Sequence, residues 1–212
     1  MDDESAIAAR VVTDAWRRVL ARLRLDAPGS RAALLDGAAP ERIDALEAEL
    51  GLRVPPELRA LWLLTAGDGG VAGAGCLPGN EALMSLDAVA AVHRLRCGFQ
   101  EREEALDALR PEPEGVVVWR TSWLPVVSHG TADHTSGWYL DTESGYLGRW
   151  SRHHEAQPEE LDTLGTYLEE VADMLEAPAL ATRDTPGLVG DALVWGSRVD
   201  PAREGAWRPL AE

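Results

Sequence analysis

Residues 41–70 constrain the fold most, because they specify two short helices and the corner that joins them. In the first half, apolar residues recur at helical spacing after Pro40, and Gly51 can supply a left-handed helix end. Pro55 and Pro56 stop that helix, since proline has no backbone N–H and holds the preceding residue out of the helical region, while Pro56 can open a second helix. A glycine-rich loop closes the segment. The sequence therefore predicts a helical hairpin with a fixed corner.

Further helices are expected on both sides of this hairpin. Apolar residues at helical spacing predict helices over residues 4–25, 85–96 and 158–176. A charged stretch over 100–110 can add a helical turn or two, with Ala105, Leu106 and Leu109 facing inward.

A run of short strands fills the second half of the chain. β-branched and aromatic residues predict strands at 116–119, 123–127, 137–141 and 146–150. Short connections between successive strands favour antiparallel pairing. We therefore expect an α+β fold, with a mainly antiparallel sheet of about four to six strands packed with helices.

The order of these motifs resembles a known family. An I-x-x-L-E helix, a G-L-x-V-P-P corner, an E-L-R-x-L-W helix and a glycine loop resemble the opening of the SUKH superfamily, which groups bacterial toxin-immunity proteins with fungal cell-wall regulators of the Smi/Knr type. A W-x-P strand, a glycine and aspartate turn, a strand ending at Asp141 and a G-x-x-G-x-W hairpin continue the resemblance. His129 and His134, in the turn before Asp141, depart from the family pattern.

The resemblance covers roughly residues 28–178 and implies a non-enzymatic protein-binding module. The chain then divides into an N-terminal helical extension (1–27), a SUKH-like domain (28–178) and a C-terminal extension (179–212), where residues 193–196 can form an edge strand ahead of a tail. Arginines surround the apolar face of the first helix. They can grip an acidic partner, or the helix can pack on the acidic body of its own chain.

The charge of the chain limits the partners it can take. Its 212 residues include 36 acidic and 20 basic side chains, a net charge of −16, and all the basic residues are arginine. An acidic surface repels phosphate backbones and attracts basic proteins, which disfavours nucleic acid as a partner. It can also serve solubility alone. The absence of lysine excludes a lysine Schiff base and a Walker-type phosphate loop.

Sequence gives no sign of a membrane segment, a cofactor or a disulfide framework. No apolar run reaches the roughly 18 residues of a membrane helix, and the N-terminus is acidic rather than basic, so we expect a cytoplasmic protein with no membrane partner. Cys76 and Cys97 are too isolated for a metal site of the C-x-x-C type. We expect no cofactor.

Aromatic residues in the strand region are the candidates for partner binding. Large amphipathic rings are favoured at interfaces because they bury much area at low entropic cost. The candidate contact residues are Trp119, Trp123, His129, Asp133, Tyr139, Asp141 and Trp150. The competing interpretation is that the tryptophans form core. On the strand, Trp138 and Leu140 must share one face and Tyr139 the other, so one face can be core while the other meets a partner.

Three motifs that suggest chemistry lack the context it needs. The G-x-G-x-x-A match at 67–72 follows a helix rather than a strand, so it does not fit a dinucleotide site. Ser128 and His129 are adjacent, which points their side chains to opposite faces of a strand. The histidines and aspartates between 129 and 141, with His153 and His154, could bind a metal, but no spacing fixes a geometry.

The preferred hypothesis is an immunity protein that neutralises a cognate bacterial toxin, of which a basic nuclease is the expected kind. The first alternative is a regulatory scaffold that binds an endogenous protein. The second is a hydrolase that uses the loop from His129 to Asp141. We expect the preferred function to involve no catalytic residue. The oligomeric state stays open.

Overall fold

The structure is a computed structural model that describes residues 3–112, 115–151, 162–181 and 183–211. The helices are α1 (Asp3–Asp26), α2 (Pro28–Ala33), α3 (Pro40–Leu50), α4 (Pro56–Leu64), α5 (Leu86–Asp107) and α6 (Leu164–Glu176). Short 3-10 helices lie at Pro78–Asn80, Pro178–Leu180, Gly196–Arg198 and Glu204–Ala206. The strands are β1 (Ala82–Leu83), β2 (Trp123–Ser128), β3 (Ser136–Asp141), β4 (Leu147–Ser151), β5 (Pro186–Val189), β6 (Ala192–Trp195) and β7 (Arg208–Pro209).

The predicted helical hairpin is present as α3 and α4. Gly51 follows α3 with a φ of 68°, the left-handed conformation in which a Cβ would be unfavourable, and its N–H bonds to the carbonyl of Glu47. Pro56 is the first residue of α4, as expected. Ile43 and Leu58 are fully buried, so the apolar stripes of the two helices face the core.

The predicted α+β class is confirmed, with an antiparallel sheet in the order β1-β2-β3-β4 and a second, three-stranded sheet in the order β6-β5-β7. One strand prediction was wrong, because residues 116–119 are irregular. The Oε1 atom of Gln100 accepts hydrogen bonds from the backbone N–H groups of Val118 and Trp119, at 2.7 Å and 3.0 Å. These groups therefore bond to a side chain instead of a neighbouring strand.

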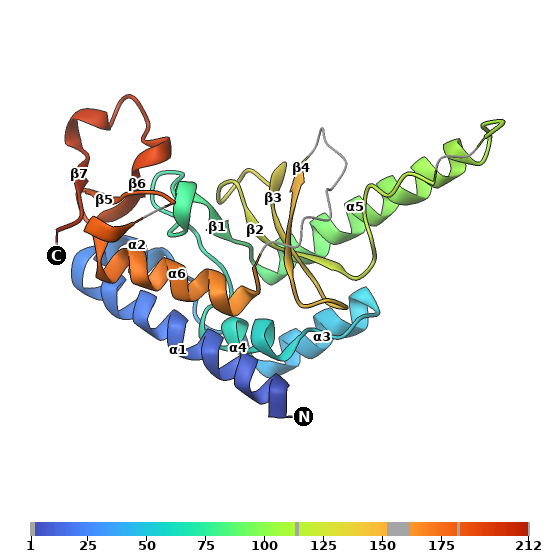
Figure 1. The fold of residues 1–212 in the computed structure, drawn as a ribbon, viewed down its shortest axis with the longest axis horizontal. Coiled ribbons are helices and arrows are strands. Elements are labelled where there is room, and N and C mark those ends of the chain that lie inside the picture. Colours follow the sequence, from blue (N-terminus) through green and yellow to red (C-terminus); the bar gives the residue numbers. More distant parts are fainter. Residues whose placement is uncertain (1–2, 113–114, 152–161, 182, 212) are drawn as a thin grey trace.

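The four-stranded sheet is covered on both faces, and α5 leaves it as an arm. Trp138 on β3 packs against Tyr167 of α6, with ring centres 5.7 Å apart. The other face carries Tyr139, Trp123 and Trp150, beneath Arg96 of α5. Figure 1 shows α6 and α5 on different sides of the strands, with the C-terminal half of α5 extending beyond the sheet.

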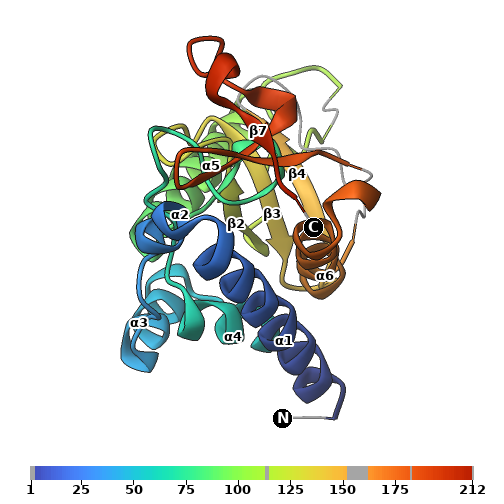
Figure 2. The same cartoon turned by 90° about the vertical axis from the view of Figure 1, so that its left-hand side faces the viewer.

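The first helix packs on the body of its own chain. α1 lies along α4 and α6, as Figure 2 shows, and buries Trp16 and Val19 completely. Arg18 binds Asp173 at 2.6 Å and Glu176 at 2.5 Å on α6. The contacts of Arg18 therefore confirm, for this residue, the interpretation that the helix packs on the acidic body of its own chain. The helix also contributes to the main core.

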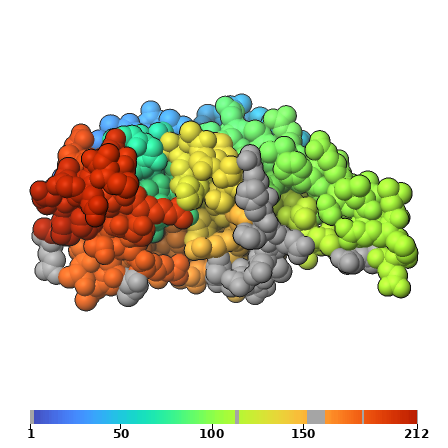
Figure 3. Space-filling model, turned by 90° about the horizontal axis from the view of Figure 1, so that it is seen from above, coloured from blue at the N-terminus to red at the C-terminus, as the bar shows by residue number. Residues whose placement is uncertain are grey.

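The C-terminal segment forms the small sheet. The predicted strand near residues 193–196 is present as β6, which is an edge of this sheet rather than of the larger one. The tail is held by Trp207, whose Nε1 donates to the carbonyl of Val194 at 2.8 Å. Seen from above, this segment and α5 lie at opposite ends of the molecule (Figure 3).

The helix predicted at 85–96 is longer than expected. α5 runs without a break to Asp107 and includes most of the stretch read as a separate turn. The expectation that Leu106 and Leu109 face inward was wrong, since these side chains are 58% and 82% exposed. Because the end of α5 extends past the sheet, it has no core beneath it.

Candidate functional site

The four aromatic candidates form one buried cluster. Trp123 stacks on Tyr139 at 4.3 Å between ring centres, and Trp119 meets Trp123 and Trp150 edge-on at 5.6 Å and 6.3 Å. None of the four is more than 3% exposed. Their burial favours the competing interpretation that these rings form core, and partner binding by them stays a prediction. The alternation on β3 fails to separate core from surface since both faces of the strand are covered.

This cluster anchors the arm formed by α5. The guanidinium of Arg96 lies 4.7 Å from the ring centre of Trp150, within the range of a cation–π contact. His93, one turn earlier, donates from Nε2 to the carbonyl of Thr121 at 2.9 Å, and Gln100 binds the backbone beside Trp119. The indole N–H groups of Trp119, Trp123 and Trp150 have no hydrogen-bond partner among the described residues. The rings therefore act here through packing.

Of the three polar candidates, His129 has the most informative contact. It follows β2 and is half-buried, with Nδ1 2.7 Å from Nη1 of Arg198. A guanidinium only donates, so the imidazole is the acceptor in this contact. Asp133 and Asp141 serve local turns, where they bind the backbone N–H groups of Thr135 and Glu143. Partner binding by these three residues stays a prediction.

The two ends of the loop named in the hydrolase alternative lie far apart. Asp141 pairs with Trp123 at one end of β2, whereas the N–H of His129 bonds to Ser136 at the other end. A separation of five strand residues or more spans about 17 Å, which is far beyond hydrogen-bond reach. Ser128 is 1% exposed and donates its hydroxyl to the carbonyl of Gly130. These groups do not assemble a catalytic arrangement.

Neither a metal nor a phosphate site is apparent in the described ranges. They contain no group of three histidine, cysteine or acidic side chains placed to hold a metal, while His153 and His154 lie outside them. In the glycine loop, Asp68 accepts hydrogen bonds from the backbone N–H groups of Gly70 and Cys76 at 2.7 Å and 2.8 Å. The loop therefore binds a buried carboxylate of its own chain.

A polar pocket, which sequence reasoning missed, lies beside His129. It has a volume of about 190 Å³, and its walls come from the 3-10 helix Pro78–Asn80 and the adjoining Glu81, from β3, β4 and α6, and from the C-terminal segment. Glu81 accepts a hydrogen bond from Nε1 of Trp138 at 2.6 Å, and Arg149 lies 4.3 Å from the centre of the same ring. Arg198 also lines the pocket. No spacing in the sequence connects these residues, since they converge only through the fold.

The pocket combines groups of both charges with a buried hydroxyl. Burial raises the pKa of Glu81, against the opposing effects of the Trp138 hydrogen bond and the nearby arginines. Tyr167 is 3% exposed, its hydroxyl has no hydrogen-bond partner among the described residues, and burial raises its pKa well above the ordinary value. Such a pocket can receive a small polar group, which includes a side chain of a partner.

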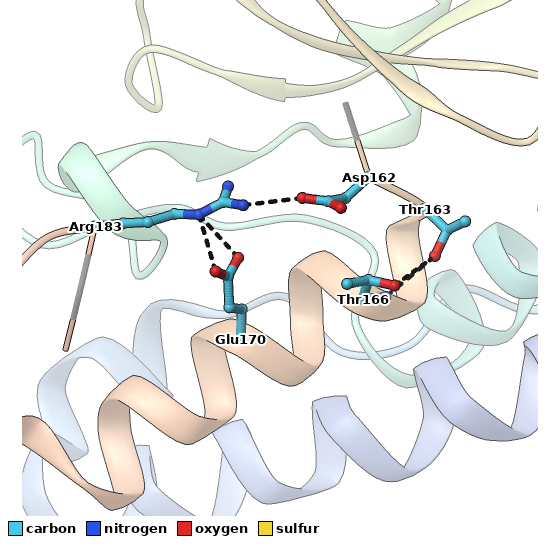
Figure 4. A network of polar contacts seen from close by, with 5 residues as sticks. All are labelled: Asp162, Thr163, Thr166, Glu170 and Arg183. Atoms are coloured by element: carbon cyan, nitrogen blue, oxygen red, sulfur yellow. Dashed lines mark hydrogen bonds and ion pairs between the residues drawn. The ribbon is translucent and has the colours of Figure 1, made fainter. Parts of the chain in front are cut away.

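One wall of the pocket is held by an ion-pair network at the start of α6. In Figure 4, Arg183 points toward Glu170 and Asp162, which it binds at 2.9 Å each. Thr163 caps the helix by accepting from the backbone N–H of Thr166, and the hydroxyls of these two threonines also bond. The network joins the C-terminal segment to α6.

His93 gives the protein a predicted dependence on pH. Burial lowers the pKa of His93 from its ordinary 6.5, although the hydrogen bond to Thr121 opposes the shift. Because the folded state resists protonation, the stability from this residue is complete above pH 6.5 and is lost as the pH falls toward the lowered pKa. We expect the unfolding free energy, measured with urea between pH 7.5 and 5, to decline less steeply in His93→Gln.

The comparison of these slopes isolates His93 from other titrating groups. Burial raises the pKa of Glu57, Asp68 and Glu81, so these carboxyls stabilise the fold as the pH falls and act with the opposite sign. All three carboxyls are present in both the wild type and His93→Gln, so their effect is the same in the two slopes. Parallel slopes for the wild type and His93→Gln would contradict the assignment.

The fold and the site define an α+β protein that buries an aromatic cluster beside its main sheet and extends α5 as an arm. The chain belongs to the SMI1/KNR4 family (SUKH-1), whose model matches residues 37–173. This match confirms the resemblance seen in the sequence. No curated protein matches the chain significantly. Within the described ranges, no helix has both the length and the apolar content that crossing a membrane requires.

Proposed function

We propose that the chain is a non-enzymatic immunity protein, which binds a basic toxin of nuclease type in the cytoplasm of a bacterial cell. The observation that carries this proposal is membership of the SMI1/KNR4 family over more than half of the chain. The role in immunity is the one that the resemblance to the wider superfamily implies.

Two properties of the molecule support a protein as the ligand. A net charge of −16 favours rapid association with a basic protein, since complementary fields steer the encounter. His129 and Asp141, the two ends of the loop in the hydrolase alternative, also lie at opposite ends of β2. Binding therefore explains the arrangement better than chemistry does.

Co-expression tests the proposal directly. We expect the chain to restore growth of cells that express the toxin domain encoded beside it, and to bind that purified domain with an affinity that falls as salt rises. Surface plasmon resonance at 50 and 300 mM NaCl measures the salt dependence. A failure to protect against every neighbouring toxin, together with capture of an endogenous protein, would favour the regulatory scaffold instead.

A further inference from the structure

The polar pocket beside His129 has an inner and an outer part. Glu81, Trp138 and Tyr167 are its more buried residues, and we call these three the floor. The exposed side chains of Arg149 and Arg198 form what we call the rim. At about 190 Å³ the pocket has the space of roughly six water molecules, each of which takes about 30 Å³ in the liquid. A ligand enclosed by this pocket is therefore small.

The floor contains polar atoms that the rest of the chain does not satisfy. Tyr167 is 3% exposed, and its hydroxyl has no hydrogen-bond partner among the described residues. Besides burial, Glu81 raises the pKa of Tyr167 and Arg149 lowers it, which places the hydroxyl among the charged groups of the pocket. Oε2 of Glu81 accepts from Trp138, but Oε1 has no such partner in the described chain. Because buried polar groups are nearly always hydrogen-bonded, these two atoms mark a place for a bound molecule.

The rim offers guanidinium groups that are not neutralised by a neighbouring carboxylate. Arg183 also lines the pocket, but the ion-pair network at the start of α6 neutralises it. Arg149 lies over an indole ring and Arg198 contacts an imidazole, and neither forms an ion pair with a carboxylate in the described ranges. Asp184 lines the pocket too, yet each of its oxygens accepts two hydrogen bonds from its own chain. The donors of Arg149 and Arg198 therefore stay available to a ligand.

The wall that carries Arg198 is fixed before any ligand arrives. Nδ2 of Asn80, which is 8% exposed, donates to the carbonyl of Arg198 at 2.9 Å, and Oδ1 accepts from the N–H of Trp195 at 2.7 Å. Asp184 accepts from the N–H of Gly79 at 2.8 Å and so joins the same two segments a second time. A wall held in this way costs little ordering when a ligand binds.

The free donors and acceptors decide which kind of ligand fits. Guanidinium groups at the rim pair best with a carboxylate, whose two oxygens match their geometry. An ionised Glu81 only accepts, so the floor requires a donor. A ligand that is only an anion leaves Glu81 without a donor, and a ligand that is only a cation meets two guanidinium groups. A carboxylate with a hydroxyl or an ammonium group beside it satisfies both parts of the pocket.

We propose that the pocket binds a small carboxylic acid that also carries a hydroxyl or amino group, with its carboxylate at the arginine rim and its donor at the floor. This inference goes beyond the immunity role and does not depend on it, because it concerns a small molecule and not a protein partner. Hydroxy acids and amino acids share the chemistry that the pocket recognises.

Four probes of similar size test the pocket on the whole chain. Lactate and alanine carry both groups, propionate lacks the donor, and isopropylamine lacks the carboxylate. The readout is the NMR signal of the indole N–H of Trp138 in ¹⁵N-labelled protein, since this group donates to Glu81 at 2.6 Å. We expect lactate, alanine or both to shift the signal to saturation at millimolar concentration, and propionate and isopropylamine to bind at least tenfold more weakly.

Variants of the rim and the floor locate the binding. Arg149→Gln removes one rim charge and should weaken binding of the tighter probe at least tenfold. Arg102→Gln is the matched control, because Arg102 is also exposed and lies over an aromatic ring, 5.8 Å from the centre of Phe99, but on α5; binding should not change. Tyr167→Phe should weaken binding without lowering the melting temperature, since its hydroxyl has no partner in the described chain to lose. Circular dichroism melting confirms that each variant is folded.

Four results would overturn the assignment of the pocket. The first is a Trp138 signal that none of the probes shifts. The second is propionate that binds as tightly as lactate and alanine, because the donor would then be unused. The third is unchanged affinity in a folded Arg149→Gln. The fourth is tighter binding of N-acetylalanine than of both acids, since the pocket would then fit the carboxyl end of a polypeptide. Toxin protection is measured separately, and its failure would leave the result for the pocket standing.

Discussion

Replacement of Trp16 by alanine is expected to lower the free energy of unfolding by about 3–5 kcal/mol. The Trp16 ring is fully buried between α1 and the rest of the core. Its Nε1 donates to Oγ1 of Thr65 at 2.8 Å, and Thr65 is only 2% exposed. The variant therefore leaves both a cavity and a buried hydroxyl that has lost its donor. Urea unfolding, followed by circular dichroism, measures the change.

The matched control is Ile7→Ala on the same helix. Ile7 is 53% exposed, so its truncation should change the unfolding free energy by about 0.5 kcal/mol or less. A loss below about 1 kcal/mol for Trp16→Ala would mean that α1 is an appended element, as the division at residue 27 expected, rather than part of the main core.

Trp119→Ala should cost a similar 3–5 kcal/mol or so, because the ring contacts Trp123, Tyr139 and Trp150 at once. Loss of the ring also removes part of the support under Arg96, which lies 5.9 Å from its centre. We therefore expect faster hydrogen exchange along α5 in addition to the lower stability.

Trp119→Phe separates packing from hydrogen bonding. The indole N–H of Trp119 has no hydrogen-bond partner in the described chain, so phenylalanine loses volume alone and should cost about 1–2 kcal/mol. If Trp119→Ala kept full stability but abolished partner binding, the ring would be a contact residue, and its assignment to the core would be wrong.

The sequence predicted local structure reliably where a residue type restricts the backbone directly. Gly51, Pro55 and Pro56 restrict φ directly, so the corner between α3 and α4 was predictable without any neighbour. The strands β2, β3 and β4 were also predicted, because their β-branched and aromatic residues are a local signal, and their short connections gave the antiparallel pairing. Residues 116–119 have the composition of a strand, yet Gln100 competes for their N–H groups. That competition involves a distant residue and leaves no periodic signal.

The candidate site was less predictable than the fold. Tryptophan suits a core and an interface for the same reason, its large area, so composition could not separate the two. Packing decides for Tyr139, whose ring lies over Gly148, where a Cβ would come within 2.2 Å of the ring carbon Cζ. The polar pocket brings together Glu81 and Arg198, which are 117 residues apart in the sequence, and only the fold makes them neighbours.

The helical hairpin, the strand meander and the acidic balance follow from the sequence alone. Proline and glycine restrict the backbone locally, apolar periodicity is a property of one segment, and net charge is a sum over residues. Membership of the family could be read from the same motifs. Tertiary structure alone decides which aromatic residues are inside and which leucines are outside. Leu58 and Leu106 are both spaced for a helix face, but α4 packs against α1, α3 and α6, whereas the end of α5 that carries Leu106 extends past the sheet. Burial depends on what lies opposite a residue, and a local pattern does not contain that information.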